Sequence, residues 1–199
     1  LTLLVDADIA LAPGTVAALR RKMSASGARF ISLMATPPLS GFWERPLLPA
    51  YIYFFKLLYP FRLANSHSAS VSAAAGGCIL IETRVLEEIG GFAALRGELI
   101  DDCALARRVK RAGHRTWIGL THSARMQRRQ RLADIWNMVA RTAFTQLRYS
   151  VLWLSVCSAL LALAFAAPVM GVILGPAAAK GAAAVTGAAM AACYLPTLR

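Results

Sequence analysis

The sequence predicts an α/β domain that is followed by transmembrane helices. Short apolar runs rich in branched side chains alternate with short helical patterns through the first 131 residues, the order expected of a sheet covered by helices. Residues 151–174 then carry no charge at all. Hydrophobic residues make up 57% of the 199 residues, against the roughly 45–50% that is usual for soluble domains.

The first nine residues form the first predicted strand. It is apolar without polar alternation, which predicts a strand buried on both faces of a parallel sheet, and it ends in Asp6 and Asp8. Ligands of open α/β sheets bind beyond the carboxyl ends of the strands. Adjacent carboxylates attract hard divalent cations, so this pair indicates a Mg²⁺ or Mn²⁺ site that holds phosphates. The alternative is a strand end in which Asp6 caps a turn and Asp8 faces water.

The elements that follow support the same fold class. Thr15 is expected to cap a helix over residues 16–23, and a second strand is expected at residues 29–34. This strand–helix–strand order predicts a parallel sheet with right-handed crossovers. Later segments add strands at 78–81 and 116–120 and helices at 83–89 and 104–112, of which the helix at 83–89 is stopped by Gly90-Gly91.

An aromatic segment covers residues 43–65 and contains few charges and three prolines. Its stretches between prolines are too short to span a bilayer. Aromatic rings with a few basic residues are typical of a position at headgroup depth. The alternative is a pair of core helices.

The distribution of charge predicts a membrane protein with its basic part in the cytoplasm. The net charge is +12, and twenty of the 22 lysines and arginines lie at or before Arg148. Basic residues next to an apolar segment favour anionic lipid over nucleic acid as the partner. We therefore divide the chain into a catalytic part at 1–131, an amphipathic juxtamembrane helix at 132–150 and a transmembrane region at 151–199. The last contains about two helices, the second weaker because Lys180 interrupts it.

The acidic residues are few and clustered. Four of the five aspartates form two pairs, Asp6/Asp8 and Asp101/Asp102. Carboxylates at a helix start can simply stabilise it. We expect one member of the second pair to cap the helix and the other to be free as a general base. The four scattered cysteines predict neither a zinc site nor a disulfide framework.

Several motifs in order resemble those of family-2 glycosyltransferases with the Rossmann-like GT-A fold. They are Val5-Asp6-Ala7-Asp8, Ala74-Ala75-Gly76-Gly77-Cys78, Gly90-Gly91-Phe92, Asp101-Asp102-x-x-Leu105-Ala106-x-Arg108 and Ala112-Gly113-His114. The segment 135–149 resembles the membrane-bound branch called hopene-associated glycosyltransferases. The resemblance covers residues 1–150 and implies the C-terminal part of a GT-A domain. The part that binds the nucleotide base would lie upstream, so we expect this chain alone to be inactive.

The resemblance also implies roles for individual residues. Asp6 would lie near the ribose and diphosphate of a nucleotide-sugar donor, and Asp8 would bind the metal. Gly76 and Gly77 would line the sugar and acceptor cleft. Asp102 would be the general base of inverting transfer, and Asp101 stands where the family usually has Glu. Three residues near the membrane, Gln146, Arg148 and Tyr149, would help to hold the donor, although their spacing departs from the family motif.

The implied activity is transfer of a sugar to a membrane lipid, related to hopanoids, on the cytoplasmic side of the bacterial inner membrane. Two alternatives remain. A phosphatase of the haloacid dehalogenase type also places Asp-x-Asp at a strand end, but the Thr-rich turn expected there is replaced by Ile9-Ala10-Leu11. A non-catalytic membrane-anchored scaffold would use its acidic pairs only to cap helices.

Overall fold

The computed structural model describes residues 1–67, 71–98, 100–147 and 149–195. The chain divides into two compact units. The first comprises Leu1–Leu48 and Phe54–Ile135, and the second comprises Pro49–Tyr53 and Trp136–Arg199. Each unit is described by itself. The predicted three-part division at residues 131 and 150 stays a prediction.

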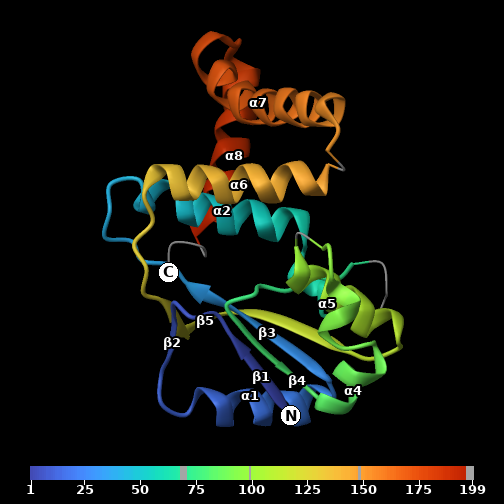
Figure 1. The fold of residues 1–199 in the computed structure, drawn as a ribbon. Coiled ribbons are helices and arrows are strands. Elements are labelled where there is room, and N and C mark those ends of the chain that lie inside the picture. Colours follow the sequence, from blue (N-terminus) through green and yellow to red (C-terminus); the bar gives the residue numbers. More distant parts are fainter. Residues whose placement is uncertain (68–70, 99, 148, 196–199) are drawn as a thin grey trace. The chain divides into compact units, whose positions relative to one another are not determined.

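A five-stranded mixed sheet forms the centre of the first unit (Figure 1). Its strands lie in the order β1-β4-β3-β5-β2. Strands β3 and β5 are parallel, whereas the pairs β1/β4, β3/β4 and β2/β5 are antiparallel. The prediction of an α/β fold is confirmed, but the prediction of a parallel sheet is wrong. The strands are β1 (Thr2–Val5), β2 (Ile9–Leu11), β3 (Phe30–Thr36), β4 (Cys78–Ile81) and β5 (Thr116–Met126).

Strand β1 also differs from its prediction, because it lies at one edge of the sheet and is not buried on both faces. Leu3 and Val5 are 37% and 39% exposed, and their neighbours Thr2 and Leu4 are half-buried. The apolar run is thus compatible with a half-covered edge strand as well as with a central one. Burial on both faces is found instead in β4, which is buried at all four residues.

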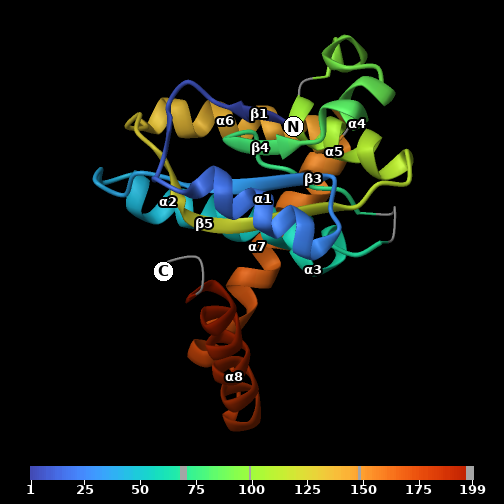
Figure 2. The same cartoon turned by 90° about the horizontal axis from the view of Figure 1, so that it is seen from below.

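Two apolar clusters cover the two faces of β3 and β4. On one face, Phe30, Ile79 and Ile81 pack with side chains of α4 (Thr83–Glu88) and α5 (Asp101–Arg111). On the other face, Ile31, Leu33 and Leu80 pack with α1 (Thr15–Ser26), which lies across the sheet in Figure 2. This alternation is the two-residue period of β-strands. A short 3₁₀ helix, η1 (Phe92–Leu95), precedes α5.

The start of α1 corrects the predicted cap. Gly14, at φ +82°, is the residue before the helix, and Thr15 is its first residue. The hydroxyl of Thr15 donates to the carbonyl of Ala12 at 2.7 Å and so closes the preceding turn rather than capping the helix. The predicted stop of α4 is confirmed, because Gly90 and Gly91 have positive φ and the N–H of Gly91 donates to the carbonyl of Leu86.

The aromatic segment forms α2 (Glu44–Leu58), with Pro49 inside it, and the short α3 (Phe61–Ala64). The second unit contains most of α6 (Leu132–Gln146), together with α7 (Val151–Leu174) and α8 (Ala177–Tyr194). In the described residues, α7 is the one helix that is long and apolar enough to cross a membrane, judged by length and composition. The weaker predicted span is helical but does not meet this criterion.

Helices α7 and α8 pack as a close hairpin (Figure 1). A β-carbon at Gly171 would lie 2.8 Å from that of Ala183, and one at Gly175 would lie 3.0 Å from that of Ala179. Small residues spaced four apart on both helices therefore permit the contact, the pattern that lets helix backbones approach closely.

Candidate functional site

The turn between β1 and β2 positions Asp6 and Asp8. The N–H of Ile9 donates to the carbonyl of Asp6 at 3.0 Å, which closes the turn. The N–H of Gln127 donates to the carbonyl of Asp8 at 2.8 Å and holds the turn against the end of β5. The predicted place of these aspartates, at the carboxyl end of the first strand, is confirmed.

The second acidic pair occupies the first turn of α5, directly after Ile100. The N–H of Asp102 donates to the Asp101 carboxylate at 3.0 Å, and the N–H of Cys103 donates to the Asp102 carboxylate at 2.7 Å. Negative charge in the first turn is favoured by the helix dipole. Both carboxylates therefore accept hydrogen bonds from N–H groups of the first turn of α5. Neither occupies the capping position that we expected for one of them.

Gly76 lies between the two acidic pairs. A β-carbon placed on it would be 3.6 Å from Oδ2 of Asp102 and 3.7 Å from Oδ2 of Asp6. Its N–H donates to the Asp102 carboxylate, and the carbonyl of Gly77 accepts from the N–H of Asp6 at 3.3 Å. The structure thus brings Asp6, Gly76 and Asp102 to one place, which we call the acidic site.

Gly77 packs against apolar side chains, whereas Gly76 lies beside carboxylates. A β-carbon on Gly77 would lie 3.3 Å from the β-carbon of Ala35 and 3.4 Å from the side chain of Ile9. This glycine allows the chain to pack closely against the sheet. Its contribution to the acidic site is the backbone carbonyl.

Burial and mutual repulsion raise the pKa values of two of these aspartates. Burial is the main cause for Asp102, whose pKa is raised to about 6, with further contributions from Asp101 and Asp6. Hydrogen bonds from the N–H groups of Cys103 and Gly76 partly offset this effect. The pKa of Asp6 is raised by burial first and then by Asp8 and Asp101. All four predicted carboxylates are therefore electrostatically coupled.

The acidic site offers oxygen ligands but not a complete metal cage. Within the described parts of the chain, no three His, Cys, Asp or Glu side chains form a group that could hold a metal ion by themselves. Mg²⁺ is usually bound by one or two carboxylates together with substrate phosphates and water. The carboxylate chemistry, and the repulsion that a cation would relieve, fit a divalent ion that binds together with a phosphate-bearing substrate.

The predicted membrane-proximal residues are Gln146, Arg148 and Tyr149, which lie in a different compact unit from the acidic site. Arg148 lies outside the described residues, and Gln146 ends α6. Tyr149 has φ +58°, and its ring packs perpendicular to Phe144 with centroids 5.5 Å apart. These residues belong to the second unit, so their role in donor binding stays a prediction.

Two residues that support the site were missed from the sequence. Ser32 is fully buried in β3, where its hydroxyl donates to the carbonyl of Ala75 at 2.9 Å and accepts from the N–H of that residue at 2.8 Å. Lys110 of α5 donates to the carbonyl of Val71 at 2.6 Å. Both side chains hold the segment that leads to Gly76. A polar residue between Ile31 and Leu33, inside an apolar strand, was the available signal for Ser32.

Comparison with known proteins identifies the family of the chain. No curated protein and no solved structure matched it. The model of glycosyl transferase family 21 matches residues 1–198. The prediction of a glycosyltransferase is confirmed, whereas its placement in family 2 is wrong. Because the match covers nearly the whole sequence, the chain belongs to glycosyl transferase family 21.

Proposed function

We propose that this protein transfers a sugar from a nucleotide-sugar donor to a hydroxyl group of a membrane lipid, with inversion at the anomeric carbon. The observation that carries the proposal is the acidic site of a family-21 chain, in which the carboxylates of Asp6 and Asp102 both lie beside Gly76. A carboxylate with a pKa near 6 is ionised at neutral pH but remains basic enough to take a proton.

Asp102 is the general base in this proposal. As the acceptor oxygen attacks the anomeric carbon, its proton passes to the Asp102 carboxylate, and the bond to the diphosphate breaks on the opposite face. The N–H groups of Gly76 and Cys103 orient this carboxylate. A β-carbon on residue 76 would lie within 4 Å of both carboxylates, so a glycine at this position adds no side-chain atoms of its own beside them.

Asp8, Asp6 and Asp101 would hold the donor diphosphate through Mg²⁺ or Mn²⁺, with Asp8 as the direct ligand. When bound, the cation would neutralise the leaving diphosphate. Asp6 would lie nearest the ribose and diphosphate. A cation bound at this place would relieve the repulsion among the four carboxylates, which favours its binding.

The lipid acceptor and the membrane location are supported by α7, an uncharged helix of 24 residues. A site in the same chain as such a helix would work at the membrane surface, where a lipid hydroxyl can reach it. We place the acidic site on the cytoplasmic side of a bacterial inner membrane, because nucleotide sugars are cytoplasmic and the basic residues precede α7. A hopanoid-related acceptor is the finer form of the proposal.

The test is a transfer assay with the full-length protein in membranes. Labelled sugar nucleotides are supplied one at a time with Mg²⁺ or Mn²⁺, and label entering the lipid extract is counted. We expect one donor to label lipid, and Asp102→Asn to lower the rate by about 10²-fold or more, because the general base is lost. Glu87→Gln, an exposed carboxylate on α4, is the matched control and should keep the wild-type rate.

The outcomes separate the proposals. Label in water-soluble products alone would overturn the lipid acceptor. Equal labelling by wild type and Asp102→Asn would remove Asp102 as the base. Absence of transfer with every donor and lipid tried would favour the scaffold.

A further inference from the structure

An exposed surface of the first unit combines aromatic and basic side chains. Phe42 is 79% exposed and Trp43 is 47% exposed, with ring centroids 5.0 Å apart. Arg128, Arg129 and Arg131 lie on the segment before α6, and all three are exposed. We call these five residues the basic-aromatic surface. Adjacent exposed rings beside charged side chains form an apolar patch with a polar rim, a combination that marks interaction surfaces.

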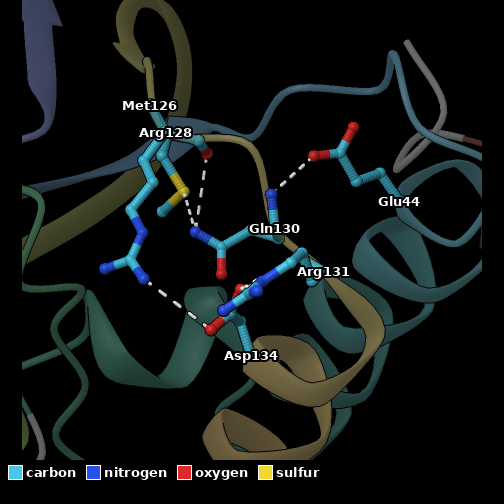
Figure 3. Close-up of polar contacts among 6 residues, drawn as sticks. All are labelled: Glu44, Met126, Arg128, Gln130, Arg131 and Asp134. Carbon is cyan, nitrogen blue, oxygen red and sulfur yellow. Dashed lines mark hydrogen bonds and ion pairs between the residues drawn. The ribbon is translucent and has the colours of Figure 1, made fainter.

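Glu44 joins the two segments that form this surface. Its side chain is buried, with 1% exposure, although it is charged. Its carboxylate accepts from the N–H of Gly41 at 2.5 Å and from the Ser40 hydroxyl at 3.1 Å. It also accepts from the N–H of Gln130 at 2.7 Å, the bond drawn in Figure 3. These bonds lower the pKa of Glu44, the one from Gln130 most strongly.

Further contacts fix the two segments beside each other. Nε of Arg129 donates to the Ser40 hydroxyl at 3.1 Å and so joins the two segments. Within the first segment, Nε of Arg45 donates to the carbonyl of Leu39 at 3.1 Å. The aromatic and basic side chains therefore belong to one ordered surface, although they lie about 85 residues apart in the sequence.

The charge of this surface selects its partner. Residues 125–134 contain four arginines and a single acidic residue, Asp134. Asp134 lies 3.7 Å from Arg128 and 3.5 Å from Arg131 (Figure 3), so it offsets only part of the positive charge. Arginine binds phosphate oxygens well, and Trp and Phe favour the boundary between water and lipid.

We infer that the basic-aromatic surface docks on an anionic lipid bilayer, with Phe42 and Trp43 at the acyl boundary and the three arginines against lipid phosphates. Buried Glu44 acts as a positioning residue that holds the rings and the arginines in register. This inference rests on the membrane location of the proposed function but not on the transfer reaction, so a binding measurement tests it separately.

The test reads the environment of Trp43 in the full chain reconstituted into vesicles. Trp117, Trp136 and Trp153 are replaced by Phe, and the folded state is checked by circular dichroism. The vesicles contain brominated phosphatidylcholine, with or without phosphatidylglycerol. We expect the brominated lipid to quench Trp43, and roughly twofold more strongly when the anionic lipid is present at low salt. Aqueous acrylamide should quench it correspondingly less.

Two pairs of variants identify the groups responsible. Arg128→Gln with Arg129→Gln should abolish the effect of phosphatidylglycerol, whereas Arg20→Gln with Arg21→Gln, an equal charge change on α1, should preserve it. Glu44→Gln should reduce quenching by lipid in both kinds of vesicle. The amide NH₂ group of glutamine cannot accept the hydrogen bonds that the carboxylate receives from Ser40, Gly41 and Gln130, so the two segments should lose their register. Glu87→Gln is its control.

Two results would overturn the inference. Trp43 could be quenched by acrylamide as strongly in vesicles as in detergent, which would mean that the surface faces water. Trp43 could also be shielded from both quenchers, which would mean that protein covers it. Transfer activity plays no part in either result, so failure here leaves the proposed function standing.

Discussion

The carboxyl group of Asp102 carries a stability cost at neutral pH. Its pKa is about 6 in the folded protein, against an ordinary value of 3.8, so the folded state binds its proton more tightly than the unfolded state does. Below pH 3.8 the group is protonated in both states and there is no cost. The cost grows as pH rises through this interval and, above pH 6, is on the order of 3 kcal/mol.

Asp102→Asn should therefore stabilise the protein while it removes activity. With a chelator present, we expect the free energy of unfolding to exceed that of wild type above pH 7, because the amide is never charged. The difference should disappear as pH falls below the ordinary pKa. Thermal unfolding in detergent across this pH range measures it. A variant that is less stable than wild type at high pH would contradict the burial argument.

Gly76→Ala should separate activity from stability. The added methyl group would make ordinary contacts of 3.6–3.7 Å with the two carboxylates, so we expect the free energy of unfolding to change by no more than about 0.5 kcal/mol. The methyl group would nevertheless occupy the space between Asp6 and Asp102, and transfer should fall by about tenfold or more.

Gly77→Ala is the comparison for this variant. Its methyl group would lie only 3.3 Å from that of Ala35, so we expect a loss of stability of about 1 kcal/mol. The two variants are compared by thermal unfolding and by the transfer assay. Wild-type activity in Gly76→Ala would show that substrate does not pass between the two carboxylates.

At the level of the site, the resemblance predicted which residues meet, but local patterns did not. Asp6, Gly76 and Asp102 are far apart in the sequence, and their proximity depends on how β1 pairs with β4. Ser32 and Lys110 were missed because their importance arises from bonds to backbone groups of a distant segment. A single side chain in a sequence does not reveal such partners.

Among the elements, Glu44 links the first turn of α2 to the segment before α6. The three donors stabilise the ionised form of the buried Glu44 carboxylate and so lower its pKa. This stabilisation of the folded protein is fully present at pH values above the ordinary pKa of 4.5. Glu44→Gln should lower the free energy of unfolding by about 2 kcal/mol at pH 7. The difference from wild type should shrink as pH falls through the lowered pKa. Unfolding by denaturant at a series of pH values checks this, and a constant difference would contradict it.

The hairpin of α7 and α8 depends on small residues. Gly171→Leu would drive a side chain into Ala183, whereas no atom lies within 4 Å of a β-carbon at Gly187. We expect Gly171→Leu to lower the unfolding temperature in detergent, with a cost of about 1–3 kcal/mol, and Gly187→Leu to have little effect. Equal effects of the two variants would mean that helix propensity, rather than packing, decides stability.

Element positions were predicted better than strand directions. The bounds of β4 and α7 agree with their predictions, because a short apolar run and a long uncharged one have clear ends. The direction of pairing was wrong because the partner of β1 is β4, some 75 residues later, and not β3, which corresponds to the second predicted strand. An apolar run also does not distinguish an edge strand with exposed Leu3 and Val5 from a central one.

For the whole molecule, the sequence indicated the enzyme class but not the family. The prediction from the Asp-x-Asp sequence after a strand and from the acidic pair at a helix start reached a glycosyltransferase but placed it in family 2. The family-21 match covers residues 1–198, including α7 and α8, which the short motifs do not cover. The proposed membrane location therefore needs a test that is independent of family.

A charge at the centre of α7 tests whether this helix crosses a bilayer. Leu163 lies near the middle of α7 and is exposed, so Leu163→Arg should leave the first unit intact. In a bilayer it should cost about 2.5–3.5 kcal/mol of insertion free energy. Leu152→Arg, near the end of the helix, is the control because its guanidinium can reach the headgroups. We expect alkaline carbonate to extract much more of Leu163→Arg than of Leu152→Arg or wild type. If all three proteins were retained equally, α7 would not be the anchor, and the exposed apolar side chains of α7 would have to be covered by protein instead.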